Sequence, residues 1–167
     1  MRTALLLVLV GAISGCTEAV KPTVRAAVNR IGGTTFEVIP SEGQYPFCLV
    51  FTLSTAGVIR QLTMSRENVS YTCPAGKPIG GHSYRAPLDE GAVKVQVLFT
   101  SQKVNAASVA QQLLDLRGRP QITSIDLRLP GNATIDTLSF APEADAAPTV
   151  GGVIGRDGVT DADAGTP

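Results

Sequence analysis

The chain is 167 residues long, and 14 lysine and arginine residues balance 14 aspartate and glutamate residues. The middle of the chain has no cluster of cations, which argues against a nucleic-acid-binding surface, because such a surface concentrates lysine and arginine on one face. Aromatic residues make up 5% of the sequence and tryptophan is absent. A folded core must therefore be built mainly from valine, leucine and isoleucine.

The first sixteen residues have the pattern of an export signal. Arg2 is followed by an apolar run over residues 4–10, and small residues lead from Gly11 towards Cys16. The apolar run is too short to span a bilayer, which needs roughly 20 apolar residues. A basic residue, a short apolar segment and small residues before a break are typical of a removable signal peptide.

The residues Ile13-Ser14-Gly15-Cys16 resemble the lipobox of bacterial lipoproteins, in which a small residue precedes a cysteine that becomes the first residue of the mature protein. Ile13 stands where that motif usually has leucine. The resemblance implies cleavage after residue 15 and acylation of Cys16. Several acyl chains anchor a protein stably, whereas a single chain holds it only marginally.

The resemblance also implies a location. Family sorting rules retain lipoproteins with aspartate after the cysteine in the inner membrane, and this chain has Thr17 there. We therefore expect a cell-envelope protein anchored through Cys16 in the outer membrane, with an envelope protein as a partner and no nucleic acid. The alternative is an ordinary secretory signal in which the cysteine is a coincidence.

Composition divides the chain into four segments. Residues 1–15 are the expected signal peptide, and residues 16–33 a lipidated tether with a short helical turn over 23–30. Residues 34–140 carry nearly all the strong patterning. Residues 141–167 are mainly alanine, glycine, proline and aspartate, so this acidic tail cannot bury enough surface to offset its conformational entropy and is expected to be disordered.

The patterned segment is predicted to be mainly β. Short alternating runs bounded by turn residues predict strands over 35–38, 47–54, 58–64, 68–73, 92–100, 122–129 and 134–140. In the run over 92–100, the valines and Phe99 are expected to point inward, and Lys94 and Gln96 outward. Asn105 is a suitable N-cap for the one segment with helical period, which ends before Gly118. These elements favour an antiparallel β-sandwich with one crossover helix near 105–117.

The residues Tyr71-Thr72-Cys73 resemble the tyrosine corner of immunoglobulin domains, where a tyrosine lies two residues before the second cysteine. The separation of the two cysteines is under half of that in the family, and the core tryptophan is missing. The resemblance therefore implies only a loosely immunoglobulin-like sandwich.

Cys48 and Cys73 remain as an even pair once Cys16 is acylated, and an oxidising compartment favours a disulfide between them. A simple meander of strands over 47–54, 58–64 and 68–73 would place the two cysteines at opposite ends, although a bridge needs Cα atoms within about 7 Å. Residues 65–73 either cross to the other sheet, or are largely loop, or the bridge does not form. We favour the crossing.

The chain lacks the motifs of common active sites, including Gly-x-Ser-x-Gly, His-Glu-x-x-His and a phosphate-binding glycine loop. His82 and Ser83 follow two glycines, in a pattern typical of an exposed loop, and Asp89 lies nearby. The tail residues Asp157 and Asp163 lack the spacing of a calcium loop. We therefore predict no catalytic residue, no metal site and no cofactor.

These observations predict a lipid-anchored protein of the cell envelope that acts as a non-enzymatic binding or structural module. Two alternatives stay open. One is an envelope hydrolase with a site near His82, Ser83 and Asp89. The other is a carrier that holds an apolar ligand between its sheets.

Overall fold

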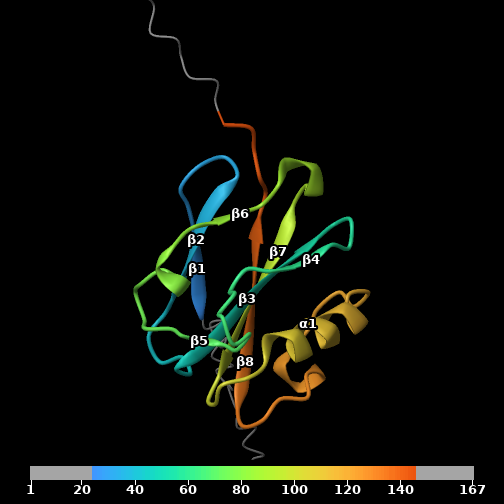
Figure 1. The fold of residues 1–167 in the computed structure, drawn as a ribbon. Helices are drawn as coiled ribbons and strands as arrows, with labels where there is room; N and C mark the ends of the chain where they lie inside the picture. Colours follow the sequence, from blue (N-terminus) through green and yellow to red (C-terminus); the bar gives the residue numbers. More distant parts are fainter. Residues whose placement is uncertain (1–23, 146–167) are drawn as a thin grey trace, which may run out of the picture.

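The computed structural model describes residues 24–145, so the predicted signal peptide, Cys16 and the tail beyond residue 145 lie outside the described residues. The described part of the chain is mainly β, with one α-helix and three short 3₁₀ helices (Figure 1). The elements are β1 (Ala26–Arg30), β2 (Thr35–Pro40), β3 (Phe47–Ser54), β4 (Ile59–Gln61), β5 (Tyr71–Thr72), η1 (Ile79–Gly81), β6 (Tyr84–Arg85), η2 (Leu88–Glu90), β7 (Val93–Thr100), α1 (Ala106–Asp115), η3 (Ser124–Asp126) and β8 (Ala133–Phe140).

The strands form two antiparallel sheets. One has the order β1-β2-β6, and the other has the order β4-β3-β7-β8, with β5 also paired to β3. The core between them takes Phe36 and Val38 from the first sheet and Val50, Val97 and Phe99 from the second, all with 0% of their surface exposed. The prediction of a mainly β fold built as an antiparallel sandwich with one helix is confirmed.

The helix α1 covers the outer face of the second sheet. Val109 and Leu113 of α1 pack there with Leu49 of β3 and other apolar residues. The side chain of Asn105 accepts a hydrogen bond from the Ser108 N–H over 3.1 Å, which confirms the predicted N-cap. Both faces of β3 and β7 are therefore largely buried.

Gln96 of β7 lies on the face of the second sheet that α1 and its neighbouring loops cover, and it is buried there. It points away from the core between the sheets, as predicted, but only 3% of its surface is exposed. Its Oε1 accepts a hydrogen bond from the Thr137 hydroxyl over 3.0 Å, so the buried amide keeps a polar partner.

The prediction of a helical turn over 23–30 is wrong, because Ala26–Arg30 is strand β1. It pairs with β2 along its whole length, from Ala26 opposite Pro40 to Arg30 opposite Phe36. Ala26 is fully buried in the core between the sheets. Residues assigned to the tether therefore belong to the folded domain, which begins before residue 34.

The predicted strand over 122–129 is also wrong. Residues 124–126 form η3, and the N-terminal residue of this turn is capped by a reciprocal contact. The Asp126 carboxylate accepts hydrogen bonds from the Thr123 N–H over 2.8 Å and from the Thr123 hydroxyl over 2.7 Å. This capping box satisfies backbone donors locally and stabilises a turn in place of an extended strand.

Cys48 and Cys73 form the predicted disulfide, with their Cα atoms 5.9 Å apart. The favoured crossing to the other sheet is wrong, because β5 pairs with β3 in the same sheet and places Tyr71 opposite Cys48. The segment between β4 and β5 is largely loop, and both strands lie on the same edge of β3. The loop leaves that edge where the Thr63 hydroxyl, in place of a backbone carbonyl, accepts the Val50 N–H over 3.0 Å.

Tyr71 helps to hold this loop. Its hydroxyl donates to the backbone carbonyl of Met64, seven residues upstream, over 2.7 Å. A tyrosine corner makes the same kind of contact, from a tyrosine hydroxyl back to the preceding backbone. The contact fixes the position of the chain just before Cys73.

Candidate functional site

The residues of the hydrolase alternative do not assemble into a hydrogen-bonded group. His82, Ser83 and Asp89 are all exposed. The Nδ1 atom of His82 lies 2.8 Å from the carbonyl oxygen of Gly80, its only hydrogen-bond partner within residues 24–145. The ring lies edge-on to Tyr84, with 5.0 Å between the ring centroids. No described carboxylate orients this imidazole, as a general base would require.

The disulfide cysteines form a covalent crosslink and offer no thiol. Across residues 24–145 there is no group of three or more histidine, cysteine, aspartate or glutamate side chains that could hold a metal ion. No helix in the same range is long and apolar enough to cross a membrane. The aspartates of the tail and the predicted lipidation site Cys16 lie outside the described residues.

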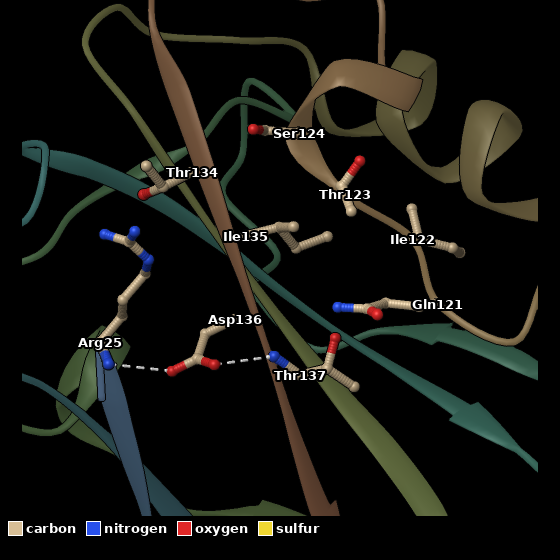
Figure 2. Close-up of a pocket in the computed structure, with 9 residues that line it drawn as sticks. All are labelled: Arg25, Gln121, Ile122, Thr123, Ser124, Thr134, Ile135, Asp136 and Thr137. Atoms are coloured by element: carbon tan, nitrogen blue, oxygen red, sulfur yellow. Dashed lines mark hydrogen bonds between the residues drawn. The ribbon is translucent and has the colours of Figure 1, made fainter. Parts of the chain in front are cut away.

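A cleft of about 250 Å³ opens along the edge of β8, and we call it the β8-edge cleft (Figure 2). Arg25 lies on one side of β8 in this view, and the segment 121–124 lies on the other. The lining residues are Arg25, Gln121, Ile122, Thr123, Ser124, Thr134, Ile135, Asp136 and Thr137. Most of them are polar, and they come from the start of β1, the η3 region and β8.

The floor of the β8-edge cleft is the outer edge of a sheet. β8 ends the strand order of its sheet, so only one of its edges pairs with β7. The Ser101 N–H donates to the carbonyl of Asn132 over 2.9 Å, in direct continuation of the β7–β8 register. Because pairing alternates along an antiparallel ladder, the backbone of Ile135 points away from β7 into the cleft. Within residues 24–145, nothing hydrogen-bonds to that N–H or carbonyl.

Asp136 joins β8 to the beginning of β1. Its Oδ2 accepts hydrogen bonds from the Arg25 N–H over 3.0 Å and from the Ala26 N–H over 3.1 Å. Its Oδ1 accepts from the Thr137 N–H over 3.0 Å (Figure 2). The carboxylate is thus occupied by three backbone donors, and its role in the described structure is to position β1.

The side chain of Arg25 extends beside β8. Its guanidinium donates to Oε1 of Gln44 over 3.4 Å, and it forms no ion pair within residues 24–145. The nearby hydroxyl of Thr134 is buried and has no hydrogen-bond partner among the described residues. A buried polar group without a partner is uncommon in folded proteins. This wall of the cleft therefore offers the cation of Arg25, and the Thr134 hydroxyl behind it is buried without a partner among the described residues.

The opposite wall is held rigid by η3. Hydrogen bonds from Thr123 lower the pKa of Asp126 and keep this carboxylate ionised. The bond from the Thr123 backbone N–H has the largest effect, and the bond from its hydroxyl comes next. Arg119 adds an ion pair to Asp126 over 2.5 Å. The hydroxyl of Ser124 and the amide of Gln121 then line the cleft from a fixed turn.

Sequence reasoning did not identify this site, because its residues come from three segments that are distant in the chain. One local signal exists. Asp136 interrupts a run of strand-forming residues at a position that faces the first sheet, and inward-pointing charges are a common mark of an edge strand. The register that places Arg25 beside it follows only from the tertiary fold.

Comparison of the chain with protein-family models, with curated proteins and with solved structures yields no match.

Proposed function

We propose that this protein is a lipid-anchored, non-enzymatic binding module of the cell envelope, and that it binds through the β8-edge cleft. The observation that carries the binding role is the open backbone edge of β8, flanked by Arg25 and by side-chain hydroxyls. The cleft supplies hydrogen-bond donors and acceptors in fixed positions. Its carboxylate, Asp136, is already used by backbone donors.

The sequence around Cys16 supports the anchor and sets its distance from the cleft. Cys16 precedes Arg25 by nine residues, and a fully extended segment of that length spans at most about 30 Å. Arg25 lines the cleft beside the middle of β8, whereas the described chain ends beyond the C-terminal end of β8 (Figure 1). An acylated Cys16 would therefore hold the cleft near the membrane surface, where an envelope partner is within reach.

The anchor is tested by metabolic labelling with a fatty acid. We expect the wild-type protein to incorporate the label and to fractionate with membranes. Cys16→Ser should do neither, and Cys48→Ser, which leaves Cys16 in place, is the matched control. Equal labelling of the wild type and Cys16→Ser would contradict the anchor.

The binding role is tested by site-specific photo-crosslinking in intact cells. A crosslinking residue at Gln121, which is exposed and lines the β8-edge cleft, should capture a discrete envelope partner. The same residue at Arg85, exposed on β6 of the other sheet, is the control and should not capture it. Equal capture from both positions, or from neither, would contradict the proposed site.

A further inference from the structure

We infer that the β8-edge cleft binds an extended peptide that adds to β8 as a new strand and presents a carboxylate to Arg25. This inference rests on the proposed function, because it names the class of partner for the same site. The partner is a protein segment in extended conformation, with a carboxylate at its C-terminus or on a side chain near it.

The backbone of β8 supports strand addition. Ile135 directs its N–H and carbonyl into the β8-edge cleft, and no group within residues 24–145 pairs with them. An exposed strand edge with unpaired backbone groups is a template for another chain. Several peptide-binding domains use this mode, in which main-chain hydrogen bonds supply affinity and side-chain pockets supply specificity.

The position of β1 limits how much of β8 is available. At its start, β1 lies beside Asp136 of β8, which accepts the Arg25 and Ala26 amides. At its end, the Arg30 guanidinium donates to the carbonyl of Ala141, just after β8, over 2.7 Å. The two strands therefore run in the same direction. Arg25 itself lies beside Asp136, so the stretch of β8 that a peptide would pair with is residues 133–135, centred on the outward-facing backbone of Ile135.

Arg25 is the group at this edge that we expect to recognise a carboxylate, because the neighbouring Asp136 is taken up by backbone donors. The Arg25 guanidinium has no acidic partner in the described chain, and hydrogen bonds between ionised groups are stronger than neutral ones. No aromatic ring lines the cleft, as stacking against a sugar would require, and Ile122 is buried in the core with 3% exposed.

The test uses the purified full chain and the probe acetyl-Thr-Val-Thr-Val-Thr with a free C-terminal carboxylate. Calorimetry or fluorescence anisotropy measures its Kd, together with that of the same peptide ending in an amide. We expect the acid to bind and the amide to bind about tenfold more weakly or worse, because the charged hydrogen bond is lost. Equal affinity for the two peptides would overturn the role of Arg25.

Two N-methylated probes test the strand addition itself. In an added strand, the amides of alternate residues face β8, and the remaining amides face solvent. Methylation of one alternate set should abolish binding, and methylation of the other set should leave Kd within about twofold. If both sets weaken binding equally, the peptide does not pair with the edge of β8 and the inference is overturned.

Variants of the protein complete the test. Arg25→Gln should weaken binding of the acid about tenfold and remove the preference over the amide, whereas Arg85→Gln on β6 should leave both unchanged. If the crosslinker at Gln121 captures a partner but none of the peptides binds, the inference fails and the proposed function stands. Binding that appears only after deletion of residues 146–167 would identify the tail as the occupant and would overturn the inference.

Discussion

The N–H of Ala26 donates to Oδ2 of Asp136 over 3.1 Å, and this contact joins residues that are 110 positions apart in the chain. It links the first strand of one sheet to the last strand of the other. At the far end of β1, the Arg30 guanidinium lies 4.5 Å from the centre of the Phe140 ring. β1 is thus held to β8 by side chains at both ends, and Arg25 is positioned at the mouth of the β8-edge cleft as a result.

We expect Asp136→Ala to lower the free energy of unfolding by about 1–3 kcal/mol, because it leaves backbone donors of β1 without their acceptor. Urea denaturation measures the loss, and hydrogen exchange should show faster exchange at the Ala26 amide. Asp115→Ala, at an exposed position on α1, is the control and should change stability by no more than about 0.5 kcal/mol. Equal stability of the Asp136 and Asp115 variants would show that the contact does not hold β1.

The disulfide between Cys48 and Cys73 closes a loop across 25 residues of sequence separation. Chain-entropy arguments give such a crosslink a stabilisation of about 3.5 kcal/mol. The double variant Cys48→Ala with Cys73→Ala should therefore unfold at a lower urea concentration than the oxidised protein, and a reducing agent should not alter it further. Thiol counting on the denatured, unreduced mature wild type should find no thiol, and two reactive thiols there would contradict the crosslink.

His82→Ala should change the free energy of unfolding by no more than about 0.5 kcal/mol, the usual range for surface positions. It should also leave any phenotype of a gene deletion fully complemented. The neighbouring Tyr84→Phe is the contrast, because the Tyr84 hydroxyl is buried and donates to the Ile79 carbonyl over 2.7 Å. Its loss should cost about 1 kcal/mol. Failed complementation by a stable His82→Ala protein would favour the hydrolase.

The stability of the η3 region should fall as the pH is lowered through the acidic range, because Asp126 becomes protonated there. Hydrogen bonds from Thr123 lower the pKa of this carboxyl in the folded protein. A lowered folded pKa stabilises the protein above the unfolded value of about 3.9, and this stabilisation is lost as the pH falls through the folded pKa. Asp126→Asn should therefore be destabilising near about pH 7, with a difference that shrinks as acid protonates the wild-type carboxyl.

Urea denaturation of wild type and Asp126→Asn across the acidic range checks this dependence. Asp115→Asn is the matched control, because the Asp115 carboxylate accepts only a side-chain hydrogen bond from Gln111 over 3.2 Å. A constant difference between wild type and Asp126→Asn at all pH values would show that the charge of Asp126 does not matter.

Local patterns in the sequence determined the longest elements of the fold. β3 was predicted with its observed bounds, and β7 and β8 to within one residue, because alternation over eight residues leaves little ambiguity. Asn105 marked the start of α1 through a contact three residues away. The disulfide was predicted from the parity of the cysteines in an oxidising compartment, without knowledge of the path between them.

Tertiary contacts decided the elements that were predicted wrongly and the site itself. The five residues of β1 carry too little local pattern to be recognised as a strand. They form one because β2 pairs with them and Asp136 accepts their first amide. The path from β4 to β5 is set by side-chain contacts, including the Thr63 hydroxyl that accepts the Val50 N–H and the Tyr71 hydroxyl that donates to Met64. The β8-edge cleft exists because β1 begins at Ala26, which places the preceding Arg25 beside the middle of β8. The sequence by itself determined the long strands β3, β7 and β8, the start of α1 and the pairing of the cysteines, because these follow from short-range pattern and composition. Only the packing of the two sheets decided which backbone edge stays open and which charge lies next to it, because those depend on residues more than a hundred positions apart.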